Sequence, residues 1–314
     1  MAPGADILYV GAANNGQPLD AALNSIVVHH SADIVTNSYG YGGEALHNGI
    51  IKPQVDIQIQ AAAEGISVFY SSGDSGDETG GVAGATPSPD FPASSPWVTA
   101  VGGTSLGVTK GNTRLFELGW ETGRSTLVKG AVPPAWSAPA YQYGSGGGTS
   151  RLFAQPSYQQ GIVSAISTTN RVVPDVSALG DPNTGMAVGQ TQTFPDGVKY
   201  DEYRIGGTSL SSPLYACMWA LAVQNDGPYG LANPTLYRTR TATLDITKDA
   251  RSTYPGDVRV DVKNSVDPTG GYTYTARYFD VDEPLTIHVR PGYDDVTGLG
   301  SPDGATWLNA VSTR

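Results

Sequence analysis

The pentapeptide GGTSL occurs twice in this chain, at residues 102–106 and again at 206–210. A serine hydroxyl does nucleophilic chemistry only where a base or a positive local field activates it, so the surroundings of each copy decide its role. The first copy continues as GVTKGNTRLF, in which Lys-Gly-Asn indicates the turn of a β-hairpin. Ser105 is therefore expected to be an ordinary strand residue.

The second copy leads into a different kind of segment. It continues as SSPLYACMWALAVQN, which predicts a buried helix with Ser211 or Ser212 as its cap and Pro213 in its first turn. Ser209 then lies at the helix N-terminus, where free N–H groups and the helix dipole stabilise an alkoxide or an oxyanion. For the pentapeptide alone, a capping serine in a glycine-rich turn is the simpler interpretation.

The N-terminal part of the chain alternates between strand-like and helix-like patterns, which predicts an α/β fold with a parallel sheet covered by helices. The expected order is strand 5–12, helix 17–30, strand 32–40, helix 53–65 and strand 66–74. In such sheets the functional loops lie at the carboxyl ends of the strands. The polar segments NSYG (37–40) and SSGDSG (71–76) are therefore expected to lie at one edge of the sheet.

The rest of the chain carries weaker signals. The glycine- and proline-rich stretch 79–191 predicts ordered loops and short strands, because aromatic residues are interleaved throughout. Beyond Thr243, the alternating segments VRVDVKN, YTYTARYF and LTIHVR predict strands, and a last helix is expected over 305–311. Nothing marks a linker, so residues 1–314 are expected to form one domain.

Composition excludes several classes of partner. The net charge of -11 and the pI near 4.7 argue against nucleic acid and against an anionic membrane surface. No apolar run approaches the roughly 18 residues of a membrane span. The single cysteine, Cys217, excludes an internal disulfide and a cysteine-built zinc site.

Segments spread over nearly the whole chain resemble, in the same order, the sedolisin family of serine-carboxyl peptidases. These segments are APGADILYV, NSYGYGGE, SVFYSSGDSG, FPASSPWVTAVGGTSL, GSGGGTSRLFAQPSYQ, VPDVSALGDPNTGM, GGTSLSSPLYA, LDIT and RPGYDDVTGLGSP. The resemblance implies a subtilisin-like fold that works without a histidine base. This agrees with the four histidines, none of which lies in an HGTH-type motif and all of which are expected at the surface or at helix ends: His29, His30, His47 and His288. A conventional histidine-based subtilisin is the more remote alternative.

The resemblance assigns the nucleophile to Ser209 and the oxyanion-hole carboxyl to Asp74, an assignment that suits acid pH because a protonated carboxyl can donate to the oxyanion. Taken alone, Asp74 could simply cap a turn. The family activates its serine with a Glu-x-x-x-Asp pair located before the APGA segment, and no such pair precedes Glu44 here. Asp20 is expected to be a first-turn helix acid rather than a substitute base. We therefore expect either a peptidase whose N-terminal segment lies outside this sequence or a noncatalytic peptide-binding protein of the same fold.

The resemblance also implies a calcium site near the C-terminus. Two carboxylates with main-chain carbonyls suit this hard cation, and the matching positions are Asp245, Ile246, Arg290, Gly292 and Asp294. Asp295 and Glu283 are nearby alternatives, and a solvated acidic loop is the interpretation without a metal.

Substrate is expected to be an extended peptide or an unfolded protein. It would lie along two walls, formed by Ser38, Tyr39 and Gly40 on one side and by Gly146, Gly147 and Gly148 on the other. The glycine-rich stretch lacks the lysine of a phosphate-binding loop. By resemblance, we further expect a secreted monomer acting as an endopeptidase or a tripeptidyl peptidase, with an upstream prodomain or N-terminal segment.

Overall fold

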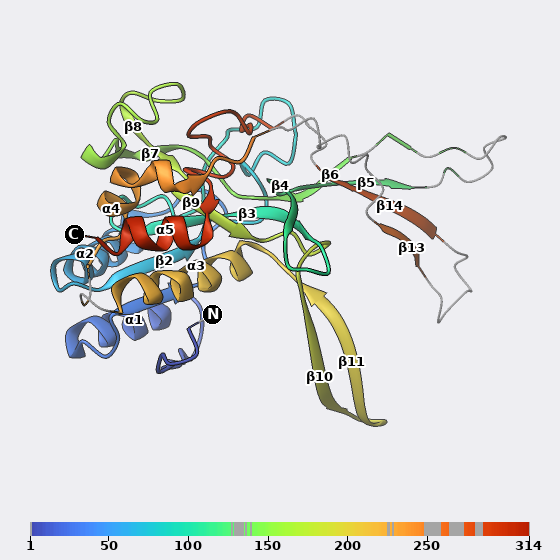
Figure 1. Ribbon diagram of the computed structural model, residues 1–314, viewed down its shortest axis with the longest axis horizontal. Helices are drawn as coiled ribbons and strands as arrows, with labels where there is room; N and C mark the ends of the chain where they lie inside the picture. Colours follow the sequence, from blue (N-terminus) through green and yellow to red (C-terminus); the bar gives the residue numbers. More distant parts are fainter. Residues whose placement is uncertain are drawn as a thin grey trace.

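The centre of the computed structural model is a five-stranded sheet in which β1, β2, β3 and β9 run parallel and β4 is antiparallel to β3 (Figure 1). These strands are β1(Ile34–Asn37), β2(Ser67–Ser71), β3(Thr99–Val108), β4(Arg114–Gly119) and β9(Val176–Leu179). The structure describes residues 2–126, 128, 135, 137–138, 140–224, 227, 229–247, 259–263, 273–279 and 285–313. The expected parallel α/β sheet is confirmed.

The register of the sheet places the two predicted functional loops side by side. Asn37 at the end of β1 pairs with Tyr70, and Ser71 at the end of β2 pairs with Val101. The carboxyl ends of β1 and β2 therefore meet at the same edge. The loops that follow them, 38–40 and 72–76, begin at that edge.

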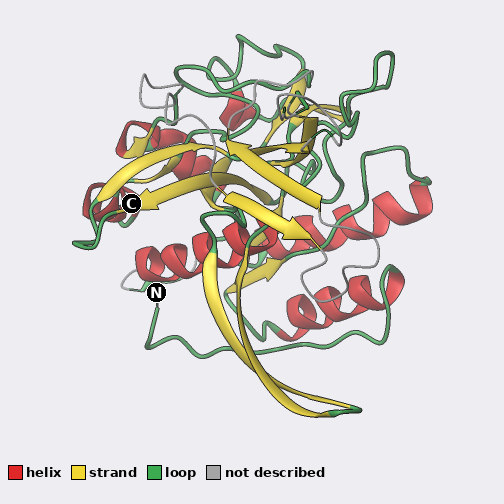
Figure 2. Ribbon diagram, turned by 90° about the vertical axis from the view of Figure 1, so that its right-hand side faces the viewer, coloured by secondary structure: helices red, strands yellow, loops and turns green. Residues whose placement is uncertain are grey.

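Helices cover both faces of this sheet (Figures 1 and 2). On one face, α1(Gln17–His29) and α2(Asn48–Ala63) enclose a core that includes Val27, Val68 and Tyr70. On the other face, α3(Thr208–Val223) and α5(Gly304–Val311) pack a second core. That second core is rich in aromatic residues, which include Phe69, Tyr215, Trp219 and Trp307. Tyr70 and Phe69, neighbours in β2, thus point to opposite faces, as alternation along a strand requires.

Shorter elements surround this body. A four-stranded sheet has the order β13-β14-β5-β6, β7 pairs with β8, and β10 with β11 forms an exposed two-stranded ribbon that projects from the body (Figures 1 and 2). These elements and the remaining ones are β5(Glu121–Thr126), β6(Ala140–Gly144), β7(Gly148–Ala154), β8(Asn170–Val173), β10(Met186–Phe194), β11(Gly197–Ile205), β12(Thr243–Leu244), β13(Arg259–Lys263), β14(Thr273–Phe279), β15(Ser301–Pro302), α4(Asn233–Arg238) and the 3-10 turns Ser157–Gln159 and Arg240–Ala242. None of the helices in the described part of the chain has the length and apolar character that a membrane crossing needs.

Three sequence-based expectations are wrong. Residues 5–12 form no strand: Ile7 and Tyr9 are 92% and 90% exposed, and the segment pairs with no strand in the described part of the chain. A favourable strand composition is not enough where no neighbouring strand supplies hydrogen bonds. The segment LTIHVR, 285–290, is likewise irregular. Finally, α3 begins earlier than expected, with Gly207 rather than Ser211 or Ser212 at its cap.

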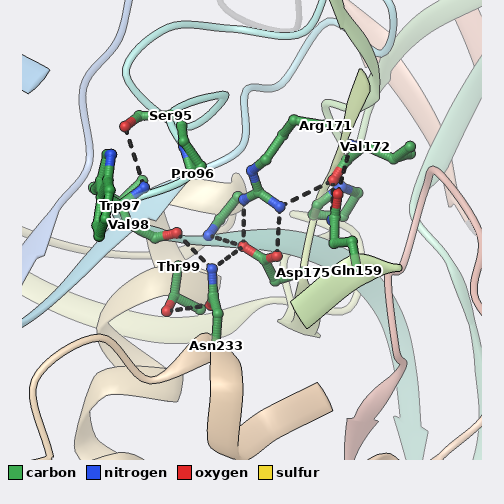
Figure 3. Close-up of polar contacts among 12 residues, drawn as sticks. Ser95, Pro96, Trp97, Val98, Thr99, Gln159, Arg171, Val172, Asp175 and Asn233 are labelled. Atoms are coloured by element: carbon green, nitrogen blue, oxygen red, sulfur yellow. Dashed lines mark hydrogen bonds and ion pairs between the residues drawn. The ribbon is translucent and has the colours of Figure 1, made fainter. Parts of the chain in front are cut away.

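A fully buried ion pair connects β8, β9, β3 and α4 (Figure 3). Arg171 donates to both carboxylate oxygens of Asp175, at 2.7 and 2.6 Å, and both side chains have 0% exposure. Asp175 also accepts from the Ala100 amide at 2.8 Å and from the Tyr237 hydroxyl at 2.9 Å. Asn233 donates to the same carboxylate at 3.3 Å. The network satisfies a charge pair in the core and fixes β9 against β3.

Removing one partner of this pair should be severely destabilising. Arg171→Met leaves the Asp175 carboxylate buried without its counter-charge, so we expect the free energy of unfolding to fall by about 3–5 kcal/mol. Chemical denaturation monitored by circular dichroism measures this loss. The matched control is Lys52→Met, which breaks the exposed pair with Asp56 and should cost about 0–1 kcal/mol. Similar losses for both variants would contradict a structural role for the buried pair.

Candidate active site

Ser209 occupies an unusual position at the start of α3. Its neighbours Thr208 and Leu210 are buried, whereas Ser209 itself is exposed. Gly207, with φ 92°, forms the cap and turns the chain into the helix. The Ser38 hydroxyl donates to the Ser209 carbonyl oxygen at 2.9 Å, which attaches the end of β1 to this turn. The hydroxyl of Ser209 is thus presented at a helix N-terminus, as its sequence context predicts.

Asp74 reaches this helix start directly. Its Oδ1 accepts from the Thr208 backbone N–H at 2.7 Å and from the Thr208 hydroxyl at 2.8 Å. Asp74 therefore satisfies one of the free N–H groups at the N-terminus of α3. A Cβ at Gly207 would lie 2.8 Å from Asp74 Oδ2, so glycine is needed there for this approach. The structure brings the two predicted catalytic residues, Ser209 and Asp74, to one helix end.

The Asp74 turn is held from behind by the glycine-rich segment. The amides of Gly144 and Gly146 donate to the carbonyls of Asp74 and Gly73, at 3.0 and 2.7 Å. Gly147 donates to the Gly76 carbonyl at 3.1 Å. This ladder fixes the main chain on both sides of Asp74.

Gly146 and Gly147 are glycines for a reason that differs from the one inferred from the sequence. Both are buried, and a Cβ would lie 2.2 Å from the Ser72 carbonyl oxygen at Gly146 and 1.8 Å from that of Asp295 at Gly147. The protein's own backbone takes up this space. Gly148 contributes to the lining of a cavity of about 720 Å³, to which neither Asp74 nor Ser209 contributes. The role of these three glycines in peptide binding stays a prediction.

A buried carboxylate connects the segments that follow the two predicted walls, Ser38 to Gly40 and Gly146 to Gly148. Tyr39 has its hydroxyl 3.3 Å from that of Tyr70 on β2. Beyond this wall, Glu44 is 5% exposed and accepts from the Ser150 hydroxyl at 2.6 Å and the Arg151 amide at 2.7 Å. Sequence reasoning identified Glu44 only as the first glutamate. Its role in joining the segments after the two walls depends on a contact between residues 106 positions apart.

Two further serines fasten α3 to the sheet. The Ser211 hydroxyl donates to the Ala178 carbonyl at 3.0 Å, and the Ser212 and Thr36 hydroxyls lie 2.9 Å apart. The run of polar residues at the start of an otherwise apolar helix was the available signal for this role. Instead of capping, Ser211 and Ser212 connect the helix to β9 and β1.

Several other predictions are confirmed. Ser105 lies in β3, is fully buried and donates to Asp181 Oδ2 at 2.6 Å. His29 and His30 end α1, and His47 caps α2 by accepting from the Gly49 amide. Asp20 lies in the first turn of α1, where partial burial raises its pKa although Gln54 donates to it.

The residues proposed to bind calcium lie around one turn. Asp245 Oδ2 accepts from the Gly292 amide at 2.8 Å, and Ile246 is buried. Asp294 is fully buried, and its Oδ1 accepts from the Val296 and Thr297 amides. No cluster of three or more His, Cys, Asp or Glu side chains suited to a metal is found within the described ranges. Of the two alternative calcium ligands, Asp295 accepts a hydrogen bond from the His288 amide. Glu283 lies outside the described residues.

The parallel sheet, with an acid after β2 beside a serine at the start of a central buried helix, defines a subtilisin-like arrangement. The family model described as the subtilase family matches residues 1–256. Kumamolisin from Bacillus sp. (strain MN-32) is 32% identical over 99% of this chain and 48% of its own length. Sedolisin from Pseudomonas sp. (strain 101) is 30% identical over 93% of this chain and 43% of its own length. The solved structure of Pseudomonas sedolisin complexed with two molecules of pseudo-iodotyrostatin superposes with a TM-score of 0.68 at 27% identity, covering 96% of this chain and 70% of that one.

The chain therefore belongs to the subtilase family, and its relatives identify it with the sedolisin family of serine-carboxyl peptidases. Human tripeptidyl-peptidase 1 is also similar, at 28% identity over 88% of this chain and 42% of that protein. The chain spans about half the length of the curated relatives it matches.

The two GGTSL serines should differ in their effect on stability. Ser105→Ala removes a donor from the buried Asp181 carboxylate and should lower the free energy of unfolding by about 1–3 kcal/mol. Ser209→Ala changes an exposed hydroxyl and should stay within about 0.5 kcal/mol of the wild type. Denaturant unfolding of the two variants side by side checks this contrast. A larger loss for Ser209→Ala would show that its hydroxyl is structural.

Proposed function

We propose that this protein is an acid-acting serine peptidase in which Ser209 is the nucleophile and Asp74 helps to stabilise the oxyanion. The observation that carries the proposal is the contact of Asp74 Oδ1 with the Thr208 amide and hydroxyl, immediately beside the exposed Ser209. Membership of the sedolisin family supports the same chemistry.

The two oxygens of Asp74 suggest a division of roles. Oδ1 already accepts two hydrogen bonds from Thr208, so a proton on this carboxyl belongs on Oδ2. Protonated there, Asp74 donates to the negative oxygen that forms when Ser209 Oγ adds to a peptide carbonyl, together with amides at the start of α3. Ionised Asp74 would repel that oxygen instead. This requirement makes the proposed reaction faster at acid pH.

The proposed mechanism also needs a general base to take the proton from the Ser209 hydroxyl. By family resemblance a Glu-x-x-x-Asp pair takes the proton from the serine, and a carboxylate base can work where a histidine would be fully protonated. The second candidate function is a noncatalytic peptide-binding protein. The bonds of Glu44, which join the segments after the two walls, would serve that function equally well.

Cleavage of an unfolded protein tests the proposal. At about pH 4, close to the reference pKa of a carboxylate base, the wild type should release peptides that Ser209→Ala does not. Ser105→Ala is the matched control and should retain cleavage at a temperature where it is folded. Cleavage that survives Ser209→Ala would overturn the assignment of the nucleophile. A folded wild type that binds peptides without cutting them would support the noncatalytic candidate.

The same proposal includes a calcium ion near the C-terminus. Asp245 and Asp294 with the carbonyl oxygens of Ile246, Arg290 and Gly292 offer the hard oxygen donors that calcium takes, and the bond from the Gly292 amide already draws Asp245 to this turn. Bound there, calcium would add a cross-link between the segment after β12 and the turn before the buried Asp294. A secreted location and peptide or unfolded-protein substrates are likewise part of this proposal.

Calcium removal should lower thermal stability. We expect chelation to reduce the melting temperature by several degrees, because an ion bound only by the folded state stabilises it by mass action. Differential scanning fluorimetry with calcium, with chelator and with calcium restored measures this effect, and Asp245→Asn should reduce it. Asp56→Asn on α2 is the control, since the Asp56 carboxylate pairs with Lys52 and is not among the proposed calcium ligands. A melting temperature that does not respond to chelator would remove the calcium site from the proposal.

A further inference from the structure

A second pair of carboxyls, Glu78 and Asp90, lies behind the Asp74 turn. Asp90 precedes Phe91 in the loop that leads to β3, and Glu78 lies four residues after Asp74. The two side chains are hydrogen-bonded to each other, and Glu78 is also bonded to Ser75. Two carboxyls can share a hydrogen bond only when one of them carries a proton. A hydrogen bond between Glu78 and Asp90 therefore requires one proton on the pair.

Asp90 packs closely against the turn that carries Asp74. Its Oδ1 accepts from the Gly43 amide at 2.9 Å, in the segment that follows the Ser38 to Gly40 wall. Its Oδ2 lies so close to Gly73 that a Cβ there would be only 2.5 Å away. Gly73 precedes Asp74, and its amide donates to the Thr208 hydroxyl at 3.1 Å. Asp90 thus contacts both the segment that follows the substrate wall and the backbone of the oxyanion turn.

Glu78 completes the contact from the other side. It has a positive φ of 62°, a conformation that is uncommon for a glutamate. A Cβ at Gly42 would lie 3.2 Å from Glu78 Oε2, so this carboxyl packs against the segment after the wall, whose next residue, Gly43, donates to Asp90. The pair therefore sits between the loop after β1 and the turn after β2.

Electrostatics favour retention of the proton. Burial, with a further contribution from Glu78 and Asp74, raises the pKa of Asp90 to about 8. Burial also raises the pKa of Glu78, with Asp77 adding to the effect. Among the described residues, the charged and titratable groups that face the pair are Asp74, Asp77 and the Tyr141 phenol from β6, and none of these supplies a positive charge. Full ionisation of the pair would leave neighbouring negative charges without a compensating cation.

We propose that Glu78 and Asp90 form a positioning pair that holds the Asp74 turn against the segment after the substrate wall while they share a proton, and that loosens this turn when both ionise. Its consequence for catalysis rests on the proposed function, because it adds a second reason for activity to fall toward neutral pH. The positioning itself does not depend on that function.

The sign of the pH effect follows from linkage. A carboxyl whose pKa is raised in the folded state stabilises the fold fully below its unfolded pKa, near 3.9, and loses that contribution as pH rises through the folded value. For Asp90 the window runs from about pH 4 to about pH 8. Thermal stability should decline across this window to the extent that the pair contributes.

The test compares melting temperatures across that window for Glu78→Gln, Asp90→Asn and the wild type. Each variant keeps a hydrogen bond, because an amide donates to the remaining carboxylate, but neither needs the shared proton. Between pH 5 and pH 8 the wild type should lose about 3 °C or more beyond the loss in either variant. Asp56→Asn, an exposed carboxylate to amide change on α2, should follow the wild type. Two variants are used so that the result does not depend on the folding of one.

Binding of a tripeptide aldehyde, which adds reversibly to a nucleophilic serine, gives the functional readout. Its affinity should fall between pH 5 and pH 8 by about threefold or more in the wild type beyond the fall in Glu78→Gln. Melting profiles and aldehyde affinities that depend on pH alike in the wild type and both variants would overturn the proposal. A melting difference without aldehyde binding at any pH would leave the positioning pair in place and count against the proposed peptidase.

Discussion

The contact between Asp74 and Thr208 is the interaction on which the site depends. It joins the carboxyl end of β2 to the N-terminus of α3, two segments 134 residues apart. Because the carboxylate takes up an otherwise free N–H at the helix start, the same bond stabilises the helix and places a carboxyl beside Ser209. Gly207 permits the close approach, and the amides of Gly144 and Gly146 hold the Asp74 turn from the other side. Ser209 is exposed, whereas Gly207, Thr208 and Leu210 beside it are buried.

The sheet beneath that contact is connected to its surroundings by further buried hydrogen bonds. Ser211 connects α3 to β9, and β9 begins one residue after Asp175, whose buried pair with Arg171 joins β3 and α4. The Leu299 amide also donates to the Asp175 carbonyl, so the C-terminal turn that includes Asp294 is tied to the same strand. The turn that carries Asp294 and the helix that carries Ser209 are therefore both hydrogen-bonded to β9 or to the residue before it.

Sequence alone could predict much of this arrangement, and the failures have physical causes. The pattern of apolar residues predicted α1, α2, β1 and β2. The two helices bury one face each, and β2 is a short apolar strand that is buried throughout. The helix context separated Ser209 from Ser105 before any geometry was available. Residues 5–12 were wrongly predicted as a strand, since composition cannot reveal whether a partner strand is present. The roles of Glu44, Thr208 and Asp90 could not be predicted either, because each depends on a long-range contact in the folded chain.

A crystal structure of the protein with a peptide aldehyde would test the central claim most directly. The account predicts a covalent bond between Ser209 Oγ and the aldehyde carbon, with the resulting oxygen within hydrogen-bond distance of Asp74 Oδ2 and of an amide at the start of α3. An aldehyde bonded to another residue, or bound beside Ser209 with its oxygen turned away from Asp74, would contradict the claim that this helix end is built for an oxyanion.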